Sequence, residues 1–383
     1  MDVSDGFRVS ACMVVKNEGA RLRRALDSMV GLIDELVVVD TGSEDDTIEQ
    51  VAAFGDRNPS VAIVLHYSPW QADFSLHRNE AFDRATGDWI FILDGDEHLV
   101  DSSAVVLRRV IPQLRPDTDA VLVTVETIGD NNLRQRFLAQ RILRRGVYRY
   151  ALPVHNQLIP NHSPAVEAHT PNGLIASYYT GTMGDKAKRS LPMLHALYDA
   201  DEKEVWARYG FDGRPPHVPS TRAHAAFFLT KTYAAIQDHR AVCEWGAIAE
   251  SLVGPNPAFA ELWCWIFYSH LALSALAPQE QARAYHAKAK DEALERGQRL
   301  HPHFLDLHSC RVANGLLSWA NSANVPDAHV YARISASGLQ KLHNIPQASE
   351  LLGIPIGWRL GGRASADVPD VLPFVEVAPP EDP

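Results

Sequence analysis

Apolar and polar positions change along the first hundred residues between two kinds of pattern. Short, nearly continuous apolar runs at 9–15, 35–40, 61–65 and 88–94 are typical of strands buried on both faces of a parallel sheet. Between these runs, apolar residues recur every three or four positions, as on one face of a helix, over 18–30, 41–54 and 75–86. This alternation predicts an α/β fold with a parallel, doubly wound sheet.

The pattern changes further along the chain. Residues 119–128 form another apolar strand, and 137–158 suggest a returning strand or a hairpin that ends at Val154 and His155. The segment 202–221 contains Gly-Arg-Pro-Pro and a third proline, which break regular structure. We therefore expect a sheet domain over 1–201, a linker over 202–221, an all-α domain over 222–362, and a mobile tail over 363–383.

The second half is rich in alanine and has helical periodicity in four segments. Their spacing is close to that of helical-hairpin repeats, whose period is about 34–40 residues, although an irregular bundle fits the pattern equally well. Residues 260–277 are more apolar than a solvated repeat face requires, so we expect part of this segment to pack on the sheet domain or in a homodimer. The segment contains Glu261 and His270 and is too short for a membrane span.

Charge and cysteine content narrow the class of protein. The net charge is −11, from 47 acidic and 36 basic residues, which argues against nucleic acid or an anionic membrane as the main partner. The four cysteines are isolated, at positions 12, 243, 264 and 310, which indicates a reducing compartment and no zinc site. With no visible signal peptide at the N-terminus, we expect a cytoplasmic protein.

Polar residues follow three of the expected strands. These are Asn17 and Glu18 after the first, Asp40 after the second, and Asp94-Gly95-Asp96 after the fourth. In a doubly wound sheet, ligands bind beyond the carboxyl ends of the strands. The turn after the first strand has no glycine-rich pattern, and the chain has no GxxxxGK[ST] motif, so dinucleotide cofactors and P-loop chemistry are disfavoured.

The stretch FILDGDEHLV, residues 91–100, places three carboxylates, Asp94, Asp96 and Glu97, directly behind a buried strand. Like charges at this spacing repel one another, and the repulsion is poorly screened near a low-dielectric strand end. A divalent cation relieves it, and carboxylate oxygens suit Mg²⁺ or Mn²⁺ bridging a diphosphate. Arg78 could pair with the same diphosphate.

Each of these residues also has a structural interpretation. Asp40 could cap a turn, Asp94-Gly95-Asp96 could form a solvated turn, and Arg78 could face solvent. A neutral imidazole at His155 suits Mn²⁺, but a lone histidine is more often structural, and the chain has 17 histidines. The residues by themselves leave both interpretations open.

Four motifs in order carry a resemblance to a known family. MVVKNEG, ELVVVDTGSEDDT, DFSLHRNEAFDRATGDWIFILDGDE and VHNQL together resemble the family 2 glycosyltransferases with a GT-A fold. The nearest subgroup is soluble and bacterial, carries C-terminal helical (TPR-like) repeats, and includes peptide glycosyltransferases that modify bacteriocins. The resemblance covers roughly residues 8–200.

This resemblance implies roles for individual residues. Asn17, Glu18 and Asp40 would hold the nucleoside of a nucleotide sugar, expected to be a UDP-sugar. Arg78 would face the diphosphate. Asp94 and Asp96 would be the DxD pair that holds Mn²⁺ or Mg²⁺, with Asp94 also touching the donor. His155 would be a further metal ligand or an acid–base group.

Two positions depart from the family pattern. The glutamate that usually follows the histidine is Asn156, whose amide cannot act as a general base, so Glu97 is our candidate for that role. Residues 177–181 read Ser-Tyr-Tyr-Thr-Gly where the family often has His-x-Gly-Tyr, which indicates a diverged acceptor side.

We therefore expect a metal-dependent, hexosyltransferase-like enzyme. It would move a sugar from a nucleoside diphosphate sugar to a peptide, glycan, natural-product or other small-molecule acceptor, with the inversion that the resemblance implies. The alternatives are a nucleotidyl- or sugar-phosphate transferase on a similar sheet, and a degenerate transferase that serves as a helical-repeat scaffold.

Overall fold

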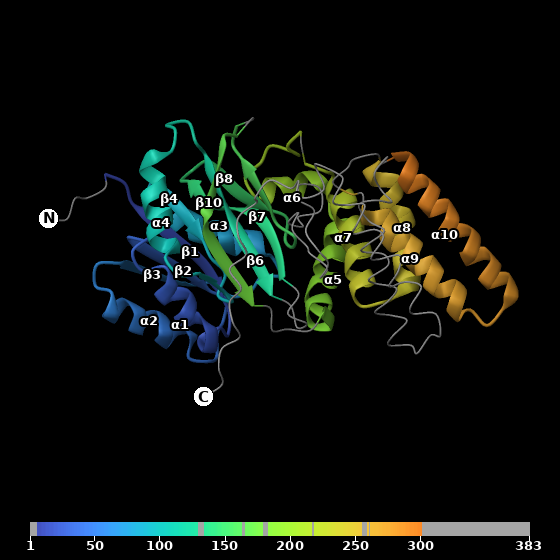
Figure 1. Cartoon of the computed structure of the whole chain (residues 1–383), viewed down its shortest axis with the longest axis horizontal. Coiled ribbons are helices and arrows are strands. Elements are labelled where there is room, and N and C mark those ends of the chain that lie inside the picture. Colours follow the sequence, from blue (N-terminus) through green and yellow to red (C-terminus); the bar gives the residue numbers. More distant parts are fainter. Residues whose placement is uncertain are drawn as a thin grey trace, which may run out of the picture.

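The computed structural model describes residues 6–128, 134–162, 165–178, 183–216, 218–254, 259 and 261–300. A sheet domain and a helical region lie side by side along the longest axis of the molecule (Figure 1). The expectations for the end of the helical region beyond residue 300, for Cys310 and for the tail at 363–383 lie outside the described residues.

The sheet domain is built on eight strands in the order β3-β2-β1-β4-β7-β6-β10-β5. Their bounds are β1 (Val9–Val15), β2 (Glu35–Asp40), β3 (Ala62–Tyr67), β4 (Trp89–Ile92), β5 (Glu97–Leu99), β6 (Ala120–Ile128), β7 (Arg134–Arg144) and β10 (Glu167–Tyr178). The four strands β3-β2-β1-β4 are parallel, as expected. Strand β7 then runs antiparallel to β4 and β6, so the second half of the sheet is mixed.

A separate two-stranded sheet follows β7 in the chain. It consists of β8 (Tyr148–Ala151) and β9 (Gln157–Pro160), which pair antiparallel. The residues that join these two strands include His155. Within 137–158 we expected a returning strand or a hairpin. Strand β7 is the strand that returns to the main sheet, and the hairpin is formed separately by β8 and β9.

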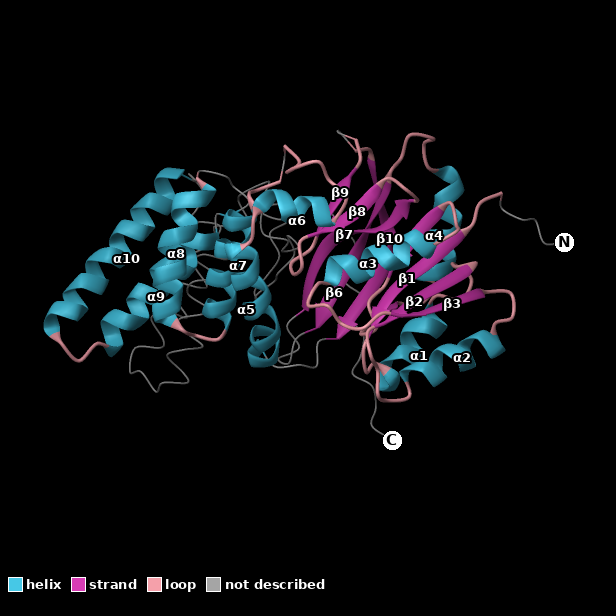
Figure 2. Ribbon diagram, turned by 180° about the vertical axis from the view of Figure 1, so that it is seen from behind, coloured by secondary structure: helices cyan, strands magenta, loops and turns pink. Residues whose placement is uncertain are grey.

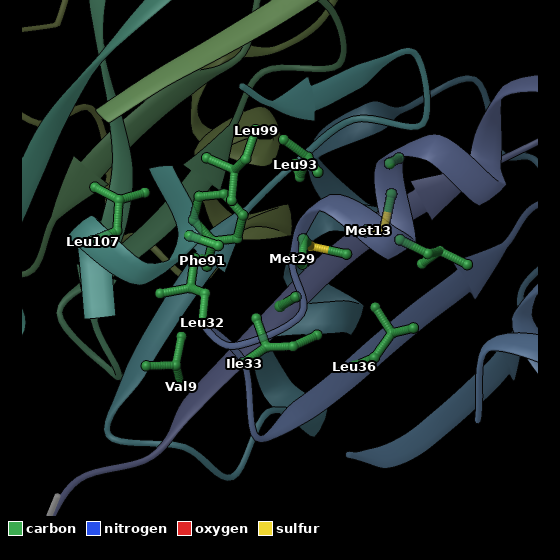
Figure 3. Close-up of a cluster of buried hydrophobic side chains, with 14 of the residues drawn as sticks. Val9, Met13, Met29, Leu32, Ile33, Leu36, Phe91, Leu93, Leu99 and Leu107 are labelled. Atoms are coloured by element: carbon green, nitrogen blue, oxygen red, sulfur yellow. The ribbon is translucent and has the colours of Figure 1, made fainter. Parts of the chain in front are cut away.

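Helices cover both faces of the parallel strands. Helices α1 (Gly19–Ser28) and α2 (Thr47–Arg57) lie on one face, and α3 (Phe74–Arg84) lies on the other (Figure 1). Figure 3 shows the apolar core under the first face, where Met13, Leu36 and Phe91 of the strands meet Met29 and Leu32. Helix α4 (Ser103–Val110) and a short 3-10 turn (Ile111–Gln113) complete this layer. The doubly wound arrangement is confirmed.

The register of the strands brings the three polar loops to one edge of the sheet. Val15 at the end of β1 pairs with Asp40 at the end of β2, and Thr41 N donates a hydrogen bond of 3.0 Å to Val15 O. Strand β4 runs parallel to β1 on its other side, and Asp94 follows it. The expected ligand-binding edge is therefore present.

The segment expected to be a linker begins with a helix. Helices α5 (Met183–Asp199) and α6 (Glu202–Arg208) follow the sheet, and Trp206 of α6 is fully buried. Its neighbours include Leu152 in the loop after β8, and Tyr209 Oη donates a hydrogen bond of 2.6 Å to Asp73 Oδ2 in front of α3. Most residues of α6 are good helix formers, and Asp201 caps the helix by accepting a hydrogen bond from Glu204 N, so burial of Trp206 adds to a local tendency that already favours a helix.

The helical region contains the four expected helices among the described residues. They are α7 (Thr221–Ala235), α8 (His239–Val253), α9 (Glu261–Leu276) and α10 (Glu280–Leu300), and successive helices pack on one another (Figure 2). This arrangement agrees with the helical-hairpin expectation.

The apolar residues of α9 are largely covered from within the helical region. Trp263 and Ile266 are buried with Phe227 and Ala293. The packing that we expected between 260–277 and the sheet domain is made instead by α5, α6 and α7. Among the described residues, no helix is both long enough and apolar enough to cross a bilayer.

Candidate active site

The loop between β4 and β5 carries the Asp94-Gly95-Asp96 motif. Glu97 N donates to Asp94 O (3.0 Å), which closes a tight turn, and Asp94 N donates to Glu97 Oε2 (3.1 Å). A Cβ at Gly95 would lie 2.8 Å from Glu18 Cγ. The motif therefore needs glycine at its centre, because the side chain of Glu18 lies directly against it.

The carboxylates of this loop differ in how their charge is balanced. Asp94 Oδ1 pairs with Arg78 Nη2 (2.8 Å), and Glu97 Oε1 pairs with Arg141 Nη2 (2.6 Å). Asp96 makes no ion pair with any residue that the structure describes. Of the three clustered carboxylates, Asp96 is the one without a direct ion pair among the described residues, and the charges of Arg21 and Lys186 act on it from a greater distance.

The pKa shifts follow the same division. Burial alone would raise the pKa of Asp94, but the charges of Arg78 and Arg141 outweigh it and lower that pKa. Burial, reinforced by the charge of Asp94, raises the pKa of Asp96. Burial also raises the pKa of Glu18, against the opposing effect of Arg21. Repulsion between Glu18, Asp94 and Asp96 is therefore present in the folded protein.

A cavity of about 480 Å³ opens beside this loop. Arg78 and Asp94 form one side of it, with Tyr150 and His155. Its other lining residues are Leu122, Leu138, Ala139, Gln140, Arg141, Asn156, Gln157 and Leu158. The cavity thus lies between the carboxyl edge of the parallel strands and the mixed half of the sheet.

Two arginines in the cavity wall have unused donors. Arg78 Nη1 donates to Tyr150 Oη (3.2 Å), but its Nε is buried and makes no hydrogen bond with any described residue. Arg141 is 8% exposed, and its Nε is likewise buried without a hydrogen-bond partner among these residues. A buried N–H without a partner is costly. Because both arginines line one cavity, their charges make its wall suitable for an anionic ligand.

The loops after β1 and β2 are joined by hydrogen bonds. Asp40 is 3% exposed, and its carboxylate accepts from Gly42 N (3.1 Å), Ser43 N and Ser43 Oγ. Asn17, at a positive φ of 54°, accepts from Glu44 N through Oδ1 (2.8 Å) and remains exposed. Asn17 and Asp40 are thus brought together, whereas Glu18 lies by the Asp94 loop.

An exposed aromatic ring borders this pair of loops. Tyr67 at the end of β3 is in register with Asp40 and is 64% exposed. Its hydroxyl lies 3.9 Å from the position that a Cβ on Gly42 would take. Gly42 has a φ of +107°, which only glycine adopts readily. Tyr67 therefore offers an aromatic surface next to the expected nucleoside site.

His155 reaches the cavity from the loop between β8 and β9. Loss of water around the ring is the main cause that lowers its pKa, to about 3, and His224, Lys231 and Lys186 add to the effect. The imidazole is therefore neutral at physiological pH. A neutral ring suits a metal ligand, and it disfavours the acid–base role that was the other expectation for His155.

Glu97 and Asn156 both have structural contacts. Both carboxylate oxygens of Glu97 are engaged, by Arg141 and by Asp94 N, and the residue is 5% exposed. Asn156 Nδ2 donates to Ser75 Oγ and to Leu152 O, at 2.7 Å each. An ionised glutamate could not donate these two bonds, which explains the amide at position 156. The geometry does not favour Glu97 as the general base.

Comparison with known proteins identifies the sheet domain. Residues 10–165 match the family described as glycosyl transferase family 2. The chain therefore contains a region that matches this family. A TPR repeat-containing protein of Synechococcus elongatus is 35% identical over 177 residues, which cover 45% of this chain and 40% of that protein. The glycosyltransferase SunS of Bacillus subtilis is 32% identical over 94 residues, which cover 24% of this chain and 21% of that protein.

The similarity covers only part of each relative, since the matched chain spans less than half the length of these two proteins. Among solved structures, the chain resembles S. aureus TarS in complex with UDP, with 14% identity and a TM-score of 0.36, over 78% of this chain and 91% of that one. The TM-score is too low to support a functional conclusion. The family 2 domain is therefore defined by sequence, and its site by the geometry above.

The carboxylates of the family 2 domain suit a divalent cation in part. Their chemistry fits, because Asp96 lies beside Asp94 and Glu18, and burial together with the charge of Asp94 raises its pKa. Within the described part of the chain, however, no three His, Cys, Asp or Glu side chains are arranged to hold a metal by themselves. His155 is therefore not gathered with Asp94 and Asp96 into one set. Two carboxylates plus substrate phosphates remain sufficient for Mg²⁺ or Mn²⁺.

Sequence reasoning missed several residues of the site. Arg141 and Tyr150 line the cavity, and Tyr67 borders the loop after β2. Arg141 directly precedes the apolar pair Ile142 and Leu143 in an expected strand, which was a visible signal, because a charged residue in a buried strand needs a partner. The positions of Tyr67 and Tyr150 carried no comparable signal, because aromatic residues are common in strands.

Proposed function

We propose that this chain transfers a sugar from a nucleoside diphosphate sugar to an acceptor nucleophile with the help of a divalent cation. The observation that carries the proposal is the pair of arginines, Arg78 and Arg141, that line one cavity together with Asp94 and whose buried Nε–H groups have no partner among the described residues. The two guanidinium charges in one cavity wall suit a diphosphate. The family 2 identity of residues 10–165 supports this assignment.

In this proposal each group at the sheet edge has a task. The turn that contains Asn17 and Asp40 binds the nucleoside, and Tyr67 packs against it. Arg78 and Arg141 orient the diphosphate and stabilise the charge that develops on it as the glycosidic bond breaks. Asp94 and Asp96 would hold Mn²⁺ or Mg²⁺, which supplies further positive charge to the leaving group when bound. His155 faces the same cavity as a neutral imidazole.

The finer points are also proposals. A UDP-sugar donor, inversion at the sugar carbon, and a peptide, glycan or small-molecule acceptor follow from the family resemblance. The general base is not assigned, since Glu97 is held by Arg141. A cytoplasmic location and a homodimer remain predictions from the sequence.

A panel of nucleotide sugars tests the proposed function. We expect one donor to raise the melting temperature in the presence of Mn²⁺ and to release its nucleoside diphosphate slowly in the absence of an acceptor. Ligand at about 100 times its Kd should stabilise the fold by about 2.7 kcal/mol. Release of pyrophosphate or of a nucleoside monophosphate would indicate a nucleotidyl- or sugar-phosphate transferase. Absence of both binding and turnover with every donor would indicate a scaffold.

Asp40→Ala tests the nucleoside site. If Asp40 binds the nucleoside, the change should weaken nucleotide affinity by about 1.5–3 kcal/mol and leave the response to Mn²⁺ intact. Isothermal titration calorimetry with the free nucleotide measures this loss. Ser43→Ala is the matched control, because it removes a partner of Asp40 within the turn but keeps the carboxylate. Equal affinity of wild type and Asp40→Ala, with a lower melting temperature of the variant, would reduce Asp40 to a structural residue of the turn.

A further inference from the structure

The loop that carries His155 has a strained backbone. Leu152 and His155 have positive φ angles of 71° and 51°, which are unfavourable for residues with a Cβ. Such angles persist only where the surroundings hold the chain in place. On one side the holding contacts come from α3, because Ser75 Oγ donates to Leu152 O (2.6 Å) and Phe74 N donates to Pro153 O (2.9 Å).

The other side of this loop is held by α7, which belongs to the helical region. The rings of His155 and Phe228 stack with their centroids 3.9 Å apart and their planes at 11°. His224, one turn earlier on α7, has Nε2 3.4 Å from Val154 O. Val154 itself is buried against Leu229. The loop is thus enclosed between a helix of the family 2 domain and a helix outside it.

Two adjacent phenylalanines of α7 face different partners. Phe227 is buried in the helical core with Phe259 and Trp265. The Phe228 ring meets the Phe227 ring edge to face, with centroids 5.1 Å apart, and also faces the sheet domain, where it covers His155. An apolar side chain of any shape would fill space there, but only a flat ring fixes the plane of an imidazole by stacking. The stacked ring of Phe228 therefore orients the His155 ring in addition to burying it.

We propose that Phe228 is a positioning residue that fixes the His155 ring in the cavity, so that the helical region forms part of the transfer site. This inference rests on the proposed function in one respect, namely that His155 takes part in transfer. It predicts that the family 2 domain needs α7 to hold the site in its active geometry. It also gives the helical region a role in catalysis besides that of binding a partner.

Phe228→Leu tests the proposal in the full-length protein. Leucine keeps most of the apolar volume but removes the ring. We expect turnover to fall by about 10²-fold, as for a small misplacement of a reacting group, while the donor KM stays unchanged. Phe228→Tyr should restore turnover, because it restores the ring. Phe227→Leu, the matched control, keeps the ring that stacks on His155 and removes one that only meets Phe228 edge to face, so it should lower the melting temperature and affect turnover much less than Phe228→Leu.

Nuclear magnetic resonance of histidine-labelled protein gives a readout that does not depend on activity. The His155 signal is identified by its loss in His155→Gln. An aromatic ring at position 228 should shift this signal upfield in wild type, in Phe227→Leu and in Phe228→Tyr. The shift should be absent in Phe228→Leu. Unchanged turnover and an unchanged His155 signal in Phe228→Leu would overturn the proposal, as would an equal loss of turnover in Phe227→Leu. If the wild type transfers no sugar, the proposed function fails, and the signal alone still decides whether Phe228 orients His155.

Discussion

Asp96→Asn is expected to lose about 10²–10³-fold of turnover while the fold becomes no less stable. The loss of turnover follows because Asp96 is the carboxylate with no ion pair among the described residues, and it would hold the cation on the departing diphosphate. Stability should not fall, because the change removes one of several clustered negative charges and keeps the size of the side chain. Sugar-transfer kinetics and melting curves with and without Mn²⁺ and nucleotide measure both effects.

The stability effect of Asp96→Asn should depend on pH in a defined direction. Burial and the charge of Asp94 raise the pKa of Asp96, so folding favours its protonated form. The stabilising contribution is then present at low pH and is lost as the pH rises through the raised pKa. The variant stays neutral throughout. The stability of Asp96→Asn should therefore equal that of wild type below the ordinary carboxyl pKa of about 4, and the variant should become the more stable protein toward neutral pH.

Asp94→Asn is the matched control, since it makes the same chemical change two residues earlier. Asp94 is paired with Arg78, and the charges of Arg78 and Arg141 lower its pKa. Its removal should therefore lower the melting temperature at neutral pH, the opposite of the result expected for Asp96→Asn. An Asp96→Asn protein that melts lower without ligand and still responds to Mn²⁺ plus nucleotide would refute the cation explanation of this loop.

Glu97→Gln should destabilise the protein by about 3–5 kcal/mol at neutral pH. Glu97 and Arg141 form a buried pair at 2.6 Å, and removal of the Glu97 charge leaves buried Arg141 without its ion-pair partner and with only the additional charge of Asp94 acting on it. Denaturant unfolding measures the loss. This outcome would assign Glu97 to the support of Arg141 and of the Asp94 turn rather than to general-base catalysis.

The double variant Glu97→Gln with Arg141→Met is the control for this interpretation. Replacement of the whole pair by neutral side chains of similar volume should recover most of the lost stability, because no buried charge remains unpaired. The opposite outcome would identify Glu97 as the base that the sequence suggested. In that case Glu97→Gln would be as stable as wild type, and its turnover would no longer increase with pH, because the ionising base would be missing.

The arrangement of strands and helices in the first hundred residues was predictable. Continuous apolar runs, such as 35–40, require burial on both sides, and the helices between them bring successive strands into parallel pairs. The polar loops containing Asp40 and Asp94 follow from this topology. The helix expected over 41–54 begins only at Thr47, because the Ser43 hydroxyl donates to Asp40 and keeps the first residues in a turn. Side-chain hydrogen bonds of this kind compete locally and leave little trace in a pattern.

The second half of the sheet and its contacts with the helices were less predictable. Strand β10 pairs with β6 and β5, both of which precede it in the chain by many residues. Neither β5 nor β10 was expected. Helix α6 occupies part of the expected linker because Trp206 finds a buried site against the loop after β8. Periodicity reports which face of an element is apolar, but not which distant element will cover it.

The sequence by itself determined the parallel strands, the edge where Asn17, Asp40 and Asp94 meet, and the family 2 character of residues 10–165. Strand alternation and loop position suffice for these features, because in a doubly wound parallel sheet the loops after the strands meet at the carboxyl edge whichever strands are neighbours. Only the tertiary structure decided that Arg141 balances Glu97 and that Phe228 covers His155. Those pairs join residues from separate elements and, for Phe228, from separate parts of the molecule. A buried charge or ring finds its partner through the packing of whole elements, which no short stretch of sequence encodes.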